Sequence, residues 1–153
     1  MEPTAVTFLR WILLLPLFGA VVNGVLGSRI QRRFGKGAIG ALAVIPVAAA
    51  FALSLHAWLR LLALAPAQRA LLDVGSRWIA IGSLHVDLAC WVDPLSCTLI
   101  LVVTGIGGLI HLYSTGYMRD DDAYWRYFAY LNLFTFAMLL LVLADNLLLM
   151  FVG

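Results

Sequence analysis

The sequence has few charged residues. Asp, Glu, Lys and Arg make up 12% of it, whereas they account for about 25% of an ordinary soluble domain. The formal net charge is only +2, which is too small for an electrostatic footprint on nucleic acid, so no nucleic-acid partner is expected. Hydrophobic residues make up 63%, and most of them stand in long runs. These proportions exclude a soluble globular domain and indicate a membrane protein whose main partner is the lipid bilayer.

Motifs that carry catalysis or bind metals are also missing. The two cysteines, Cys90 and Cys97, make no metal-ligand pattern, so both are predicted to be free thiols, one near the surface and one in a helix. We find no nucleophile–base pair, phosphate-binding loop or paired carboxylates, and the acidic run at residues 120–122 is most simply a solvated loop. The residues alone therefore predict no catalytic, cofactor or metal site in this chain.

Four apolar runs are each long enough to cross a bilayer, which takes about 20 residues. They predict membrane helices over residues 6–27, 38–64, 95–118 and 127–144. A shorter run after Asp145-Asn146 predicts the start of a fifth helix. The predicted fold class is an all-α polytopic membrane protein with four full transmembrane helices and part of a fifth.

The segment between the second and third runs has a different pattern. Leu84, Val86 and Leu88 alternate with polar residues, as in a half-buried strand. Gly82-Ser83 separates these residues from another short apolar run, which predicts a short extramembrane β-hairpin. Asp93 and Pro94 then predict the N-cap and first residue of the next helix. We divide the chain into residues 1–92, with two helices and the hairpin, and residues 93–153.

Basic residues predict the orientation, because they concentrate in cytoplasmic loops. The densest group, residues 29–36, contains Arg29, Arg32, Arg33 and Lys36. Placing this loop and the loop at 119–126 in the cytoplasm leaves the N-terminus and the hairpin on the periplasmic side.

Polar side chains at membrane depth are costly and often functional. His111, about two-thirds along the third run, is either a proton relay or a residue near the cytoplasmic interface. Asp145 is either a helix-capping turn residue, the interpretation we favour, or a charge at the mouth of a proton path. His56 lies one turn from Arg60 and suggests an interfacial role, and Asn23 suggests a helix contact.

The second half of the chain carries a family resemblance. VDPLSCTLILVVTGIGGLIHLYSTGYM, followed by YWRYFAYLNLFTFAMLLLVLADNLLLMFVG, resembles the N-terminal part of subunit L of bacterial respiratory complex I, which corresponds to chain 5 of the mitochondrial enzyme. The resemblance is specific over residues 93–153, whereas only the layout of spans and hairpin fits before that.

The resemblance implies an antiporter-like, proton-translocating subunit in the membrane arm of NADH:quinone oxidoreductase, in the bacterial inner membrane. Its partners are the other membrane-arm subunits, and NADH, FMN, iron–sulfur clusters and quinone are bound elsewhere in the complex. The family continues the last motif with Trp-Glu-Gly-Val-Gly, and that Glu handles protons. It would lie about 13–14 Å along the fifth helix, near the bilayer midplane. We therefore expect this chain to be an N-terminal fragment that does not pump alone.

Two alternatives stay open from the sequence. Related multi-subunit cation/proton antiporters and membrane-bound hydrogenases share the antiporter-like module. A stand-alone structural or assembly membrane protein is the alternative from another class.

Overall fold

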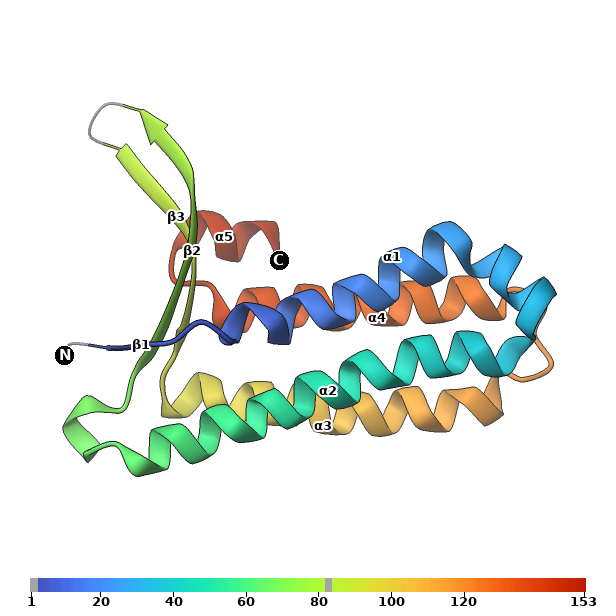
Figure 1. Cartoon of the computed structure of the whole chain (residues 1–153), viewed down its shortest axis with the longest axis horizontal. Coiled ribbons are helices and arrows are strands. Elements are labelled where there is room, and N and C mark those ends of the chain that lie inside the picture. Colours follow the sequence, from blue (N-terminus) through green and yellow to red (C-terminus); the bar gives the residue numbers. More distant parts are fainter. Residues whose placement is uncertain (1–2, 82–83) are drawn as a thin grey trace.

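Four long helices run antiparallel, side by side (Figure 1), in the computed structural model, which describes residues 3–81 and 84–153. They are α1 (Leu9–Phe34), α2 (Lys36–Ala63), α3 (Pro94–Tyr117) and α4 (Tyr124–Leu143). Each is long and apolar enough to cross a membrane. A small sheet lies at one end of the bundle and the short connections α1–α2 and α3–α4 lie at the other. The predicted mostly helical, polytopic class is confirmed.

The segment predicted as a basic loop at residues 29–36 is mostly helical. Helix α1 continues to Phe34, and Gly35 alone links it to α2. No helix breaker follows the apolar run, and basic side chains are stabilising near the negative C-terminal end of a helix. Gly35 has φ +80°, a conformation that costs glycine little and other residues more. The loop prediction was therefore wrong in conformation.

The start of α3 matches its prediction, and the start of α4 does not. Asp93 Oδ1 accepts a hydrogen bond from the Ser96 amide at 2.7 Å, and Ser96 Oγ accepts one from the Asp93 amide at 2.8 Å. This reciprocal pair is a capping box, with Pro94 in the first helical position as predicted. Helix α4 begins at Tyr124, three residues before the predicted boundary.

The predicted hairpin is present and longer than expected. Strand β2 (Leu71–Ile81) pairs antiparallel with β3 (Leu84–Val92), and the predicted turn at residues 82–83 lies outside the described residues. A further strand, β1 (Thr4–Ala5), pairs in parallel with β2. The sequence pattern did not indicate β1, because two residues are too few to show a period.

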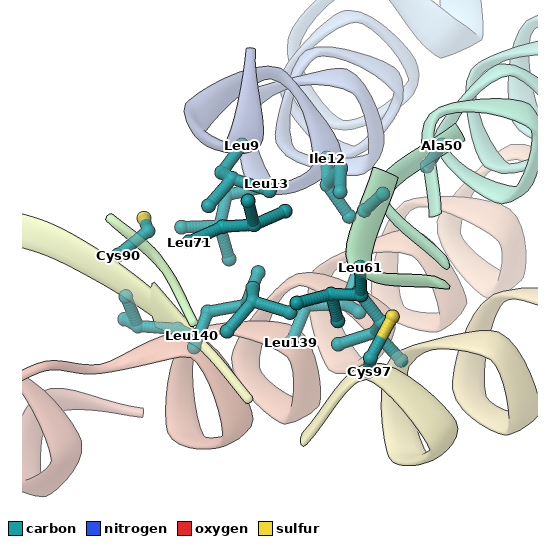
Figure 2. Packing of buried hydrophobic residues seen from close by; sticks show 14 of the residues in the cluster. Leu9, Ile12, Leu13, Ala50, Leu61, Leu71, Cys90, Cys97, Leu139 and Leu140 are labelled. Carbon is teal, nitrogen blue, oxygen red and sulfur yellow. The ribbon is translucent and has the colours of Figure 1, made fainter. Parts of the chain in front are cut away.

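One face of the sheet is part of the helical core. Leu71 of β2, together with Cys90 and Val92 of β3, belongs to a buried cluster to which all four long helices contribute. Figure 2 shows Leu71 and Cys90 beside leucines of α1 and α4, with Cys97 of α3 on the far side. Both thiols are free and buried, so the prediction that one lies near the surface was wrong.

The carboxylate of Asp73 fastens the sheet to α1. Asp73 is 1% exposed, and its oxygens accept hydrogen bonds from the backbone amide of Arg10 and from Arg10 Nε, both at 3.1 Å. The Arg10 amide lies in the first turn of α1, where amides have no partner within the helix, and the N-cap Phe8 supplies no side-chain bond. Asp73 therefore caps the helix from another element and also forms an ion pair with Arg10.

Removing this carboxylate is expected to loosen the hairpin. Burial, and secondarily the nearby Asp73 charge, raises the pKa of the Cys90 thiol to about 12, so at pH 8 it stays protonated and unreactive. In Asp73→Ala the pKa falls toward its ordinary value, and we expect faster alkylation of Cys90 at pH 8, measured by peptide mass spectrometry. Asp122→Ala, which removes an exposed carboxylate at the other end, is the control. Equal alkylation rates in the two variants would contradict the role of Asp73.

Candidate functional site

His111 lies inside the bundle, toward the end opposite the sheet. Its side chain is fully buried, and its Nδ1 lies 2.7 Å from the carbonyl oxygen of Gly107. A carbonyl only accepts, so Nδ1 carries the hydrogen and Nε2 is left as an acceptor. Nε2 is buried and has no hydrogen-bond partner among the described residues. This position is compatible with proton exchange at Nε2, provided that water or another donor reaches it.

A cleft of about 260 Å³ between α3 and α4 includes His111 in its wall. The other lining residues are apolar, except for Thr135. The Thr135 hydroxyl donates to the Leu131 carbonyl at 3.0 Å, which leaves its oxygen able to accept. The volume of the cleft is well above that needed for one water molecule, and the side chains of His111 and Thr135 supply polar partners for such a water. The cleft therefore suits a small number of water molecules beside the imidazole.

Two asparagines lie buried between helices. Asn23 of α1 donates to the carbonyl of Ile39 in α2 at 3.5 Å, which agrees with its predicted role as a helix contact. Asn132 of α4 donates to the carbonyl of Phe128 at 3.0 Å. A Cβ on Gly19 of α1 would stand 3.0 Å from Asn132 Oδ1, so glycine there allows the close approach.

Asn132 was not among the site residues predicted from the sequence. Its signal was available, because an amide inside an otherwise apolar run is as unusual as His111. The Oδ1 atoms of Asn23 and Asn132 have no partner among the described residues, and buried polar atoms without partners are rare. With His111 Nε2 and Gln31 Oε1, they make four buried acceptors without a partner among the described residues.

Asp145 is separated from these groups. Its backbone amide donates to the Ala89 carbonyl of β3 at 3.3 Å, and its side chain is exposed at the sheet end. His111 lies about 25 Å along α3 from the start of that helix at the same end, so the two candidates do not form one site.

The cap that we expected from Asp145 comes from its neighbour. Asn146 Oδ1 accepts the Leu149 amide at 2.8 Å, and Asn146 Nδ2 donates to the Asp87 carbonyl at 3.0 Å. Asn146 is therefore the N-cap of the short helix α5 (Leu147–Val152) and connects it to β3 by a hydrogen bond. Assigning the cap to Asp145 was wrong by one residue, because Asn146 has the extended backbone of an N-cap and supplies the oxygen that accepts from the Leu149 amide.

Two further polar contacts lie at the ends of the bundle. Lys36 Nζ donates to the carbonyls of Arg119 and Asp121, both at 2.8 Å. The basic segments at 29–36 and 119–126 therefore lie at the same end, as their predicted orientation requires. At the sheet end, Arg60 Nε lies 3.5 Å from His56 Nε2, and the exposed His56 ring meets Phe8 edge-on.

The family model that matches the chain is "NADH-Ubiquinone oxidoreductase (complex I), chain 5 N-terminus", over residues 78–128. Subunit L of NADH-quinone oxidoreductase from Mycobacterium tuberculosis is 39% identical over 148 residues, 96% of this chain. Chain 5 of NADH-ubiquinone oxidoreductase from Allomyces macrogynus is 41% identical over 142 residues, 93% of this chain. Subunit L from Escherichia coli is 50% identical over 76 residues, half of this chain and 12% of the relative.

The alignments to the M. tuberculosis and A. macrogynus proteins extend over the first two helices, where the sequence resemblance had rested on layout alone. They cover 23% of the M. tuberculosis protein and 21% of the A. macrogynus protein. The chain thus spans about a fifth of the length of these curated relatives.

The Asn146 cap is open to a direct test. Asn146→Ala removes the acceptor of the Leu149 amide, and loss of such a cap costs about 1 kcal/mol. We expect about fivefold faster hydrogen exchange at the Leu149 amide in detergent, measured by NMR. Asp145→Ala is the matched control, and it should leave this rate unchanged. If Asp145→Ala accelerates exchange at Leu149 as strongly as Asn146→Ala, the assignment of the cap is wrong.

Proposed function

Since the chain is homologous to the N-terminal region of complex I subunit L, or chain 5, we propose that it forms part of an antiporter-like, proton-translocating membrane-arm subunit of NADH:quinone oxidoreductase. The observation that carries the proposal is 39% identity over 96% of the chain to a subunit L. The four candidate membrane spans fit such a place in a membrane arm.

In this proposal the chain contributes to proton translocation only as part of a full subunit, with the other membrane-arm subunits as partners. The redox chemistry lies elsewhere, where NADH, FMN, iron–sulfur clusters and quinone are bound. The membrane is the bacterial inner membrane, with the α1–α2 and α3–α4 connections in the cytoplasm and the hairpin in the periplasm. The name subunit L of the bacterial relatives and the basic residues near these connections support this placement.

In this proposal, helix α5 corresponds to the helix that carries the family's proton-handling Glu. It begins at the sheet end and packs on α4. A Cβ on Gly153 would stand 3.0 Å from the Ala137 carbonyl oxygen of α4, so the two helices are in close contact. We propose that α1 to α4 are scaffold, and that α4 holds the fifth helix in place by this contact.

We also propose that His111 relays protons within the assembled subunit. The support is its burial, its Nδ1 bond to Gly107 and its unused Nε2 beside the cleft between α3 and α4. Protonation at Nε2 and release through water in the cleft need no movement of the ring. We leave Asp145 out of this proposed relay, because it is exposed at the opposite end of the bundle.

Copurification tests the family role. The protein is tagged at its N-terminus in its own organism, extracted in mild detergent and analysed by mass spectrometry. We expect subunits of NADH:quinone oxidoreductase to accompany it. Cation/proton antiporter or hydrogenase subunits would instead support those relatives, and a stable product without partners would support a stand-alone membrane protein; either result overturns the proposal.

The relay is tested by His111→Gln in the assembled complex. Glutamine can still donate to the Gly107 carbonyl but does not titrate, so a purely structural role survives the change. We expect fewer protons pumped per NADH oxidised, measured in vesicles, with the complex still assembled. His56→Gln, an exposed histidine at the sheet end, is the control. An unchanged ratio in His111→Gln would show that His111 is structural.

A further inference from the structure

A groove runs along the outside of the bundle between α2 and α3. Its hollow near the connections has a volume of about 600 Å³ and is bordered by Lys36, Arg119 and Tyr124. A second hollow, about 590 Å³, lies deeper between the same helices. Val44 and Leu112 line both hollows, so the two form one continuous groove.

The chemistry of the groove changes along its length. Lys36 and Arg119 are the charged residues among the described residues that line the outer hollow. Among the described residues that line the deeper hollow, the polar side chains are those of Thr98 and Thr104, and their hydroxyls donate to carbonyls of their own helix. None of the described residues that line either hollow is acidic. The groove is therefore cationic at the membrane surface and apolar at membrane depth.

The cationic end is held in place. Lys36 Nζ donates to the carbonyls of Arg119 and Asp121, so one of its three N–H groups remains available. These two bonds fix the ammonium beside Arg119. This end of the bundle carries more basic than acidic residues. The six basic residues are Arg29, Arg32, Arg33, Lys36, Arg119 and Arg126, and the three acidic residues are Asp120, Asp121 and Asp122.

The dimensions suit one lipid leaflet. From Lys36 to Phe51, which lines the deeper hollow, α2 rises about 22 Å. Half of a hydrocarbon core is about 15 Å, which leaves several ångströms for a headgroup. Gly116 borders the outer hollow, and no atom lies within 4 Å of where its Cβ would stand. The space at the headgroup end is therefore open.

We propose that this groove binds an anionic phospholipid of the leaflet at the connection end. Its phosphate pairs with Lys36 and Arg119, and one acyl chain lies in the apolar hollow between α2 and α3. Charge complementarity selects an anionic headgroup, and the continuity of the two hollows selects a lipid over a soluble anion. The proposal requires a membrane but does not depend on the role in complex I.

Photocrosslinking in the purified protein, with any subunits that accompany it, tests the site. The probes are phosphatidylglycerol and phosphatidylcholine with the same photoactivatable acyl chain, and crosslinked peptides are mapped by mass spectrometry. We expect phosphatidylglycerol to label the α2 and α3 segments around Val44 and Leu112 several-fold more than phosphatidylcholine. Each basic residue near an anionic surface contributes about fivefold, so Arg119→Gln should weaken this preference by about that factor. Arg29→Gln is the control outside the groove.

Steric occlusion provides the second comparison. Gly116→Leu fills the outer hollow and should lower labelling by both lipids. Gly107→Leu is the control and should leave labelling unchanged, because Gly107 lies on the other side of α3, in the His111 cleft. Both glycines have open space at Cβ, so neither substitution forces a clash, and circular dichroism checks folding. Equal labelling by both lipids, no effect of Arg119→Gln and Gly116→Leu, or full competition by inorganic phosphate would each overturn the proposal. Lipid labelling of another subunit, with none on the α2 and α3 segments, would likewise overturn the proposal.

Discussion

The buried carboxylate of Asp73 sets the arrangement of the sheet end of the bundle. A carboxylate without partners in such a place costs several kcal/mol, so its position is stable only while Arg10 faces it. The Asp73 carboxylate also accepts a hydrogen bond from the Arg10 amide in the first turn of α1. The buried cluster that includes Leu71 and Cys90 packs between the sheet and the helices. The hairpin in turn binds Asn146 and the backbone of Asp145, so the start of α5 depends on the same contacts.

The helices were predictable because lipid permits few alternatives. A segment in the hydrocarbon must satisfy its own backbone groups, so long apolar runs become helices whatever their neighbours are. The boundaries depended on local chemistry instead. Asp93 and Pro94 identified the start of α3. The end of α1 at Phe34 was missed, because the charged residues before it were interpreted as a loop. The pairing of β1 with β2 joins residues more than sixty positions apart, and a local pattern contains no information on it.

The candidate site was predictable only in part. His111 stood out because imidazoles are rare in apolar runs, and Asn132 stood out for the same reason but was overlooked. The sequence did not show that α3 and α4 leave a cleft beside His111, or that α2 and α3 leave a groove at Gly116. The cleft and the groove both depend on how neighbouring helices pack, and this packing is determined by side chains from two helices together.

The single-residue link at Gly35 also bears on how the protein enters the membrane. Helices α1 and α2 together hold 54 residues, and with one residue between them neither can cross the bilayer while the other waits outside. They form one helical hairpin whose tip carries Arg32, Arg33 and Lys36. Moving that tip across the membrane would cost several kcal/mol for each charge. In the proposed orientation the tip stays in the cytoplasm, so we expect both helices to insert together, with their topology set by the same three charges.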